Sequence, residues 1–292
     1  MDFLIQFAQQ LSNGTVIGVI YALMAIGLTI AFGIMNVGNF AQGEFYMLGA
    51  VATFFLVSLL KLNYFMSLLI SGIIIFALGV IVEFLTIKPL QLRGFMPVIL
   101  STLGLSVFFQ HLALILWGPV PRSIPAPLSK KPFCFFEIYI TPQRVLVLVG
   151  GVLIIAALYL LIKKTKVGMA MRAVAKDSNT ASLMGINIRR IYLFSFGLSC
   201  ALAALAGGLI GPLYTISPMM GEVPVIKAFS VVIMGGMGNV QGAIVAGFIL
   251  GVVESLGAGF ISTSYKDAIA FGIMILVLLF RPQGIFGKQG LR

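Results

Sequence analysis

Long runs of apolar residues alternate with short polar or basic segments along this chain. The apolar runs fall near 13–35, 44–60, 64–87, 96–117, 143–162, 190–211, 223–238, 240–260 and 266–281. Because a helix needs about 20 apolar residues to cross the hydrocarbon core of a bilayer, most of these runs predict transmembrane helices. The run 223–238 is short for a crossing, and segment 36–43 is polar and rich in glycine. We expect both to form broken or re-entrant elements packed inside the protein.

The composition supports an integral membrane protein. The 292 residues are 60% hydrophobic and 9% charged, which a soluble domain of this length does not reach. We therefore predict one all-α, polytopic transmembrane domain over residues 1–292, with about eight or nine spans. The net charge of +11 lies in loops between the spans, so the sequence argues against a cytosolic or nucleic-acid-binding protein. The lipid bilayer is the expected surrounding.

Basic residues indicate the orientation of the spans. Segment 163–190 contains seven Lys and Arg residues and one acid, and loops with such an excess of basic residues stay in the cytoplasm. We then expect loop 118–142 to lie outside, together with the N-terminus. Prolines at 119, 121, 125, 127 and 132 favour an extended docking segment in this outer loop.

The same basic segment contains the signals of a short helix. Asp177 is a good N-cap, residues 178–184 can form one or two turns, and Gly185 can provide a left-handed stop. An ordinary solvated loop is the alternative, but it would need the charges and not a capped helix. We expect this helix to bind another protein on the cytoplasmic side.

A polar motif lies between the first two apolar runs. Asn36, Asn39, Gln42 and Glu44 follow one another closely, and such groups are costly in lipid unless they face water or each other. Glu44 would fall in the first turn of the next helix, where the helix dipole favours an anion. The motif predicts a polar break that lines a translocation path, with a surface loop before a capped helix as the alternative.

Other polar side chains fall within or near the apolar runs. For Glu254 we favour a hydrogen-bonded structural carboxyl over a proton relay. Glu83 is expected to extend to the membrane interface, and Lys227 to pair with Glu222 about one helical turn away. We expect His111 to be a packed imidazole rather than a proton carrier.

The sequence contains no motif for catalysis. It has no phosphate-binding loop of the Walker type, no cluster of metal-ligating residues and no nucleophile–base pair, so we expect no catalytic residue, metal site or cofactor. Gly235, Gly236 and Gly238 permit a close backbone approach or a hinge. Segment 238–242 echoes segment 38–43, which two related halves or chance similarity would explain.

The basic segment resembles the cytoplasmic coupling segment of bacterial ATP-binding-cassette importer permeases. Residues 175–186 read Ala-Lys-Asp-Ser-Asn-Thr-Ala-Ser-Leu-Met-Gly-Ile. This is similar to the Ala-x-Asp-x3-Ala-x3-Gly-Ile pattern of the branched-chain amino-acid permeases of LivH type. Asn179 and Thr180 stand where the wider permease family has Glu and Ala.

Further blocks resemble the same family in the same order along the chain. They comprise residues 18–23, 39–44, 47–49, 168–173, 227–229, 235–238, 265–267 and 281–285. Gln42 stands where the family has a histidine, and loop 118–142 is the least similar part.

The resemblance implies a permease subunit of an ATP-driven importer for branched-chain or related amino acids in a bacterial inner membrane. It also implies partners: two separate ATPase subunits, a second permease subunit of LivM type and an extracytoplasmic solute-binding protein. Urea or short amides are the alternative substrates within the family. A self-sufficient channel or carrier is the alternative outside it.

The residues expected to serve ATP-driven transport form two groups. Coupling to the ATPase is assigned to Arg172, Ala175, Asp177, Ala181, Gly185 and Ile186. The translocation path is assigned to Tyr21, Asn36, Asn39, Gln42, Glu44, Gly235, Gly236 and Gly238. In the coupling group, the small residues Ala181 and Gly185 are expected to allow close contact with the ATPase.

Overall fold

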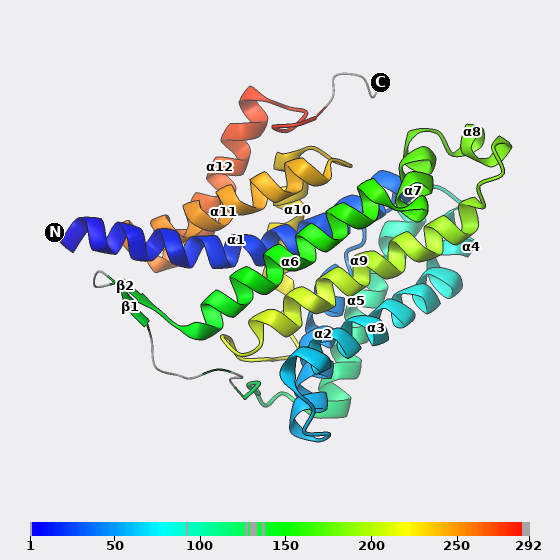
Figure 1. Ribbon diagram of the computed structural model, residues 1–292. Coiled ribbons are helices and arrows are strands. Elements are labelled where there is room, and N and C mark those ends of the chain that lie inside the picture. Colours follow the sequence, from blue (N-terminus) through cyan, green and yellow to red (C-terminus); the bar gives the residue numbers. More distant parts are fainter. Residues whose placement is uncertain (1, 92, 126–127, 129–132, 136–137, 288–292) are drawn as a thin grey trace.

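The protein is a bundle of long helices (Figure 1). The computed structural model describes residues 2–91, 93–125, 128, 133–135 and 138–287. Within these residues, seven helices are long and apolar enough to cross a membrane. They are α1 (Asp2–Met35), α3 (Tyr64–Val82, continued by the π-helical turn η1, Glu83–Ile87, and by α4, Lys88–Gln91), α5 (Phe95–Trp117), α6 (Pro142–Lys164), α9 (Ile188–Ile210), α11 (Val240–Phe260) and α12 (Lys266–Phe280, preceded by the 3-10 turn η2, Thr263–Tyr265). This confirms the predicted all-α, polytopic fold.

Two further apolar helices are shorter than a full crossing. Helix α2 (Gln42–Ser58) has 17 residues, and α10 (Glu222–Gly235) has 14. At about 1.5 Å per residue, α10 is roughly 21 Å long, whereas the hydrocarbon core of a bilayer measures about 30 Å. The expectation of a broken element at 223–238 is therefore confirmed, and the predicted span 44–60 also falls short.

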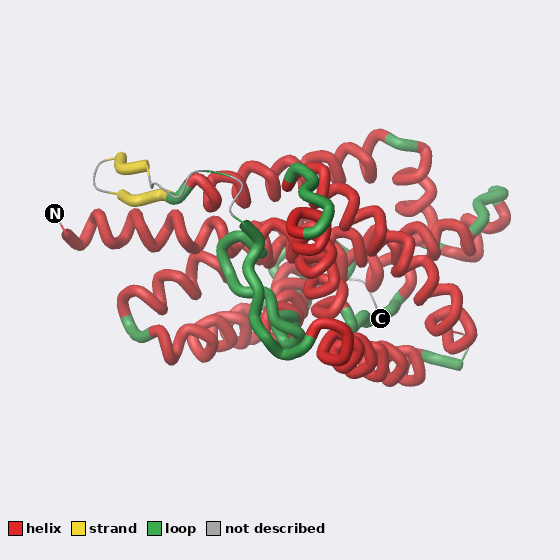
Figure 2. The backbone as a smooth tube through the Cα atoms, turned by 90° about the horizontal axis from the view of Figure 1, so that it is seen from below, coloured by secondary structure: helices red, strands yellow, loops and turns green. Residues whose placement is uncertain are grey.

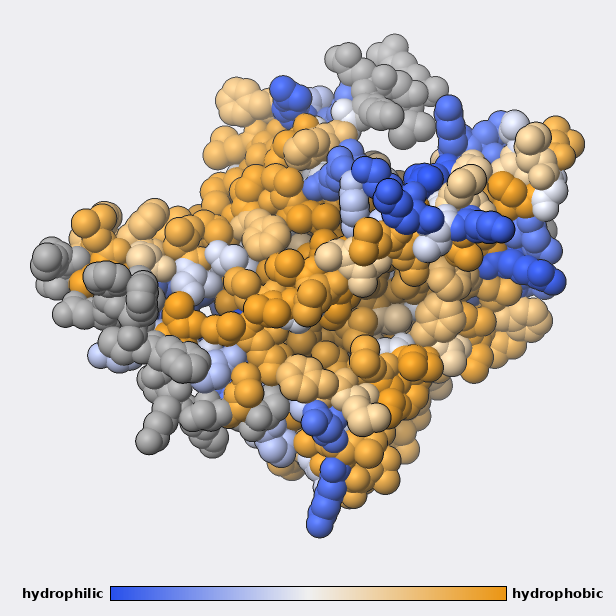
Figure 3. Space-filling model, in the orientation of Figure 1, coloured by the Kyte–Doolittle hydropathy of each residue, from blue (hydrophilic) through white to orange (hydrophobic). Residues whose placement is uncertain are grey.

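Helices α1 and α9 form the centre of the bundle. The most apolar stretch of each is 78% buried, compared with 22% for α5 and 6% for α12. The peripheral helices leave many large apolar side chains uncovered, and Figure 3 shows that these cover most of the visible surface. Such a surface suits a lipid environment, in which only the centre of the bundle has to be closely packed.

The first helix is longer than the apolar run 13–35 predicted. It begins at Asp2, and the rings of Phe3 and Phe7 pack against Phe260 of α11. Farther along the contact between α1 and α11, a Cβ atom placed on Gly14 would lie 2.6 Å from the Cα atom of Val252. Small residues at this interface let α1 and α11 approach closely along much of their length.

The two ends of the bundle differ in character. A hairpin of β1 (Phe133–Phe135) and β2 (Ile138–Ile140) lies beside the start of α1 (Figure 2), where the backbone N–H of Tyr139 donates to Gln9. Helices α7 (Lys166–Lys176) and α8 (Ser178–Leu183) lie at the opposite end, where hydrophilic side chains gather in Figure 3. We call these the hairpin end and the basic end.

The start of α1 and the described residues of loop 118–142 therefore lie at the same end of the bundle, as expected from the charges. The hairpin was not expected in a proline-rich loop. Within the described part of the loop, Arg122 forms an isolated bridge with Ile216, in the loop before α10. Pro127 and Pro132 lie outside the described residues.

Candidate functional site

The basic end contains one helix that the sequence predicted and one that it did not. Helix α7 begins at Thr165, whose hydroxyl accepts a hydrogen bond from the backbone N–H of Gly168. Its buried side chains, Met171 and Val174, lie about one turn apart, and the more exposed Val167 precedes Met171 by four residues. That spacing, together with the threonine cap, is the signal that would have identified α7 from the sequence.

Helix α8 has the predicted start and end. The Asp177 carboxylate accepts hydrogen bonds from the backbone N–H groups of Asn179 (2.9 Å) and Thr180 (3.3 Å). The Thr180 hydroxyl also donates to this carboxylate, and these hydrogen bonds lower the pKa of Asp177 below its ordinary value. Gly185 follows the helix with φ +81°, the left-handed conformation expected of a C-terminal glycine.

Helix α8 exposes two large apolar side chains. Leu183 is 88% exposed, and Met184, the residue that caps the end of the helix, is 79% exposed. Both lie in the segment between the predicted spans 143–162 and 190–211. Ala181, by contrast, is buried, so its small side chain packs within this chain. This corrects the expectation that Ala181 provides close contact with a partner. Gly185 likewise has open space where a Cβ would lie, so within the described structure its role is conformational.

The other predicted coupling residues connect α8 to the long helices. The Arg172 guanidinium donates to the carbonyl of Ile162, which ties α7 to the end of α6. Ile186 is half-buried against the core, just before α9 begins, and Ala175 is exposed on α7. The coupling role of these residues remains a prediction.

The polar motif after α1 lies inside the bundle. Asn39 donates through Nδ2 to Gln42 Oε1 (2.9 Å), and Gln42 donates through Nε2 to the carbonyl of Ser199 (3.0 Å), near the middle of α9. The Ser199 hydroxyl donates to the carbonyl of Gly27 in α1 (2.7 Å). The motif is thus a buried break and not a surface loop, and its two amides hold the break against α1 and α9.

Asn36 stands apart from this network. It is exposed and has φ +53°, so it terminates α1 in the left-handed conformation that asparagine tolerates better than most residues. Its predicted place in the translocation path is not supported by any contact with Asn39 or Gln42 among the hydrogen bonds of the described residues.

The two short helices begin at a common point. Gly43, in the first turn of α2, lies against Gly221, the N-cap of α10, and a Cβ atom on either residue would overlap the backbone of the other. Each helix carries an acid in its first turn, Glu44 in α2 and Glu222 in α10. The N-terminal ends of two helices and two carboxylates are therefore close together.

Both acids are held by α5. Ser106 donates through its hydroxyl to Glu44 Oε1 (3.1 Å), and Gln110 donates through Nε2 to Glu222 Oε1 (2.6 Å). Ser106 and Gln110 are four residues apart, so they occupy the same face of α5. Glu44 is only 3% exposed, whereas Glu222 is exposed.

Lys227 forms a buried ion pair that the sequence did not predict. Its ammonium lies 2.6 Å from Glu254 Oε1 and 2.7 Å from Asp267 Oδ1, and the Tyr21 hydroxyl donates to the other Glu254 oxygen (2.9 Å). The predicted pairing with Glu222 is wrong, because residues five apart project about 140° from each other around a helix. Glu254 is hydrogen-bonded, as expected, and Tyr21 belongs to this cluster. The structural role of Glu254 remains a prediction.

Two other expectations about polar residues are wrong. The Glu83 side chain is fully buried in the π-helical turn, where Arg189 of α9 donates to it at 3.0 Å, so it does not extend to the interface. His111 is exposed, because α5 lies at the edge of the bundle and this position faces away from it.

The glycine run forms a tight turn between α10 and α11. Gly236 and Gly238 have φ angles of +101° and +82°, and a Cβ on Gly235 would lie 2.5 Å from the carbonyl carbon of Gly242. The close backbone approach that was predicted is thus confirmed. The proposed lining role of these glycines remains a prediction.

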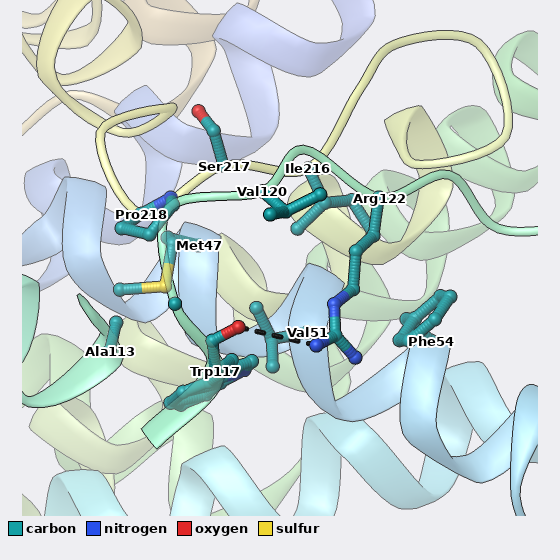
Figure 4. Close-up of a pocket in the computed structure, with 11 residues that line it drawn as sticks. Met47, Val51, Phe54, Ala113, Trp117, Val120, Arg122, Ile216, Ser217 and Pro218 are labelled. Atoms are coloured by element: carbon teal, nitrogen blue, oxygen red, sulfur yellow. Dashed lines mark hydrogen bonds between the residues drawn. The ribbon is translucent and has the colours of Figure 1, made fainter. Parts of the chain in front are cut away.

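A small, mainly apolar cavity lies near the hairpin end (Figure 4). Met47 and Val51 of α2 and Ala113 and Trp117 of α5 contribute to its wall. Arg122 closes one side, where its guanidinium donates to the Trp117 carbonyl (3.2 Å). Met47 and Ala113 follow Glu44 and Gln110 by one helical turn, and neither acid lines the cavity.

The sequence is similar to those of known membrane transport proteins. A family model described as "Branched-chain amino acid transport system / permease component" matches residues 10–278. The chain is 36% identical to the high-affinity branched-chain amino acid transport system permease protein BraD of Pseudomonas aeruginosa, covering 99% of this chain and 98% of BraD. It is 34% identical to the permease protein LivH of Escherichia coli K12, covering 97% and 96%.

One solved structure shares the fold. A chain of PsaBC from Streptococcus pneumoniae in complex with Fab superimposes with a TM-score of 0.53, covering 94% of this chain and 92% of that one. The sequence identity is 11%, so this likeness concerns the arrangement of the helices alone.

Proposed function

The chain belongs to the branched-chain amino acid transport permease family, and on that premise we propose that it is the membrane-spanning subunit of an ATP-driven importer of branched-chain amino acids. It is a multi-pass membrane protein of a transport family. In the proposed importer it lies in a bacterial inner membrane and acts with a second permease subunit of LivM type, two ATPase subunits and an extracytoplasmic solute-binding protein. The ATPase subunits, and not this chain, hydrolyse ATP.

The observation that carries the coupling part of the proposal is the exposed tip of α8, formed by Leu183 and Met184. These apolar side chains protrude from a helix whose start and end are both fixed, by Asp177 and Gly185. They lie in the most basic segment of the chain, which the positive-inside rule assigns to the cytoplasm. Exposed apolar side chains on a rigid element outside the membrane favour contact with another protein.

The contacts of α8 suggest how motion would reach the interior. Helix α8 is followed directly by α9, and α7 is tied to α6 through Arg172. The middle of α9 carries Ser199, which holds Gln42 of the polar break against α1. A displacement of α8 by closing ATPase subunits would therefore move α9 as a rigid element and shift the point where the break is held.

The tip of α8 is the place to test this proposal. In the complete importer, Leu183→Asp and Met184→Asp should reduce co-purification of the ATPase subunits and ATP-dependent leucine uptake, because each places a charge in an apolar contact. Leu60→Asp makes the same kind of change at an exposed position before α3 and should leave co-purification intact. Normal co-purification and uptake in both tip variants would reject the coupling role. Uptake of urea in place of leucine would reject the substrate.

A further inference from the structure

Glu44 differs from the other buried acids of the described structure. Glu83 is paired with Arg189, and Glu254 with Lys227. Among the described residues, no Lys or Arg lies within ion-pair distance of Glu44. The described residues thus provide a cation for two of the buried carboxylates and not for the third.

One oxygen of Glu44 is also without a hydrogen bond. Oε1 accepts from Ser106, but Oε2 is buried and has no partner among the described residues. A buried carboxylate oxygen left in this state is strongly unfavourable, because the group has lost its water and gained nothing in return. The missing partner is therefore expected to come from outside the described residues.

The N-terminal ends of two helices meet beside Glu44. It lies in the first turn of α2, and Gly43 brings the start of α10 against the same point. Both helix dipoles present their positive ends there, which stabilises a carboxylate. Glu222 of α10 adds a second acid, which is exposed. It accepts a hydrogen bond from Gln110, one helical turn beyond Ser106 on α5. The arrangement places a buried carboxyl behind an exposed one, and a positively charged hydrogen-bond donor complements the pair.

The neighbouring groups narrow the class of cation. The described residues contain no cluster of three or more metal-ligating side chains, whereas Mg²⁺ and Ca²⁺ require several oxygen ligands. The apolar residues Met47 and Ala113, which line the small cavity, lie one helical turn beyond Glu44 on α2 and Gln110 on α5. A hydrogen-bond donor with one positive charge and a short apolar body matches both features, which describes a primary alkylammonium group.

We propose that Glu44, assisted by Glu222, binds the ammonium group of the transported amino acid. Glu44 Oε2 accepts the hydrogen bond that it lacks among the described residues. The apolar side chain of the substrate lies against the apolar surface near Met47, because the cavity itself is too small to enclose it. This inference rests on the proposed function for the identity of the substrate, but the site itself can be tested on this chain alone.

The single tryptophan of the chain provides a probe. Trp117 lines the same cavity as Met47, so the fluorescence of the purified full-length chain reports on binding near Met47. We expect 3-methylbutylammonium chloride to change this fluorescence in a saturable way. Sodium 3-methylbutanoate has a matching branched skeleton with the opposite charge and should not, and potassium chloride controls for ionic strength. An equal response to the ammonium and the carboxylate would overturn the proposal.

Substitutions locate the effect at Glu44. Glu44→Gln keeps the acceptor for Ser106 and removes the charge, and it should weaken binding of 3-methylbutylammonium by about tenfold or more, the size of a lost charge-assisted hydrogen bond. Glu222→Gln should have a smaller effect, because that acid is exposed. If Glu44→Gln does not fold, Glu44→Asp keeps the charge on a shorter side chain and should weaken binding while retaining the preference for ammonium. Unchanged affinity in the folded Glu44 variant would overturn the proposal.

Uptake by the complete importer separates this inference from the proposed function. Absence of leucine uptake by the wild-type importer would reject the proposed function and leave the fluorescence result standing. Wild-type uptake that is unchanged by Glu44→Gln would reject the ammonium site alone. Loss of co-purification with the second permease subunit in Glu44→Gln would also reject it, because the missing cation would then belong to that subunit.

Discussion

Gly43 lies directly against Gly221, so that the starts of α2 and α10 touch through their backbones. This contact joins two helices that are too short to cross a membrane and places their N-terminal ends inside the protein. Irregular backbone at this depth is tolerated only where protein or a water-filled path surrounds it. The contact therefore fixes a polar region of the bundle, with Glu44 in the first turn of one helix and Glu222 in the first turn of the other.

A methyl group at this contact should destabilise the fold. Gly43→Ala places a Cβ against the Gly221 carbonyl and should lower the free energy of unfolding by about 1–3 kcal/mol, as overpacking does elsewhere. Thermal unfolding of the detergent-purified chain measures this. Gly104→Ala in α5 is the control, since its Cβ would meet open space in the described structure and should be neutral or slightly stabilising. Equal thermal unfolding midpoints for Gly43→Ala and Gly104→Ala would contradict the close contact of Gly43 with Gly221.

Removing the buried ammonium of Lys227 should destabilise the fold more than the Gly43→Ala substitution does. Lys227→Met leaves Glu254 without its nearest cation and should cost about 3–5 kcal/mol of unfolding free energy. Lys266→Met is the matched control, because Lys266 lies 4.0 Å from the same carboxylate but is partly exposed, and it should cost less than about 1 kcal/mol. The double variant Lys227→Met, Glu254→Gln should be less destabilised than Lys227→Met. A more severe loss in the double variant would argue against a direct pair.

The conformation of Gly185 should matter for coupling and not for insertion. Gly185→Ala forces an L side chain into the left-handed region, at a strain of about 1–2 kcal/mol, and should distort the end of α8. We expect lower ATP-dependent uptake with an unchanged amount of the chain in the membrane. Ser182→Ala changes an exposed residue of the same helix and should leave uptake as in the wild type. Equal uptake in both variants would show that the α8 stop is dispensable.

The cap of α8 should persist in mild acid. Its hydrogen bonds lower the pKa of Asp177, so the cap contributes fully above the ordinary aspartate pKa and is lost as the pH falls through the lowered value. Aspartate is present only at positions 2, 177 and 267, so selective ¹³C labelling gives few carboxyl signals. The signal that Asp177→Asn removes should titrate below the usual range. Titration at or above that range would contradict the cap.

Local sequence signals were sufficient to predict the structure of two regions. The order Asp177 to Gly185 specifies a cap and a stop, and α8 has both. Asn39 and Gln42 between two apolar runs predicted a buried break, since amides in that setting have to satisfy one another. In each region the decisive interactions join residues close in the sequence or follow from burial alone.

The remaining features depend on contacts between distant segments. Lys227 and Glu254 come from different helices, and no periodicity in either helix indicates which acid the lysine meets. The contact of Gly43 with Gly221 joins residues from opposite halves of the chain. The position of Glu44 was predicted, but the lack of a cation beside it became visible only once the neighbouring helices were placed.

The central claim is that this chain moves its substrate only when other subunits supply energy through α8. The most direct test compares leucine uptake into vesicles that contain the complete importer with uptake into vesicles that contain this chain alone, each with and without ATP. We predict uptake only in the complete importer with ATP, and its loss when Leu183 is replaced by Asp. Uptake at the same rate by the chain alone, without nucleotide, would contradict the account.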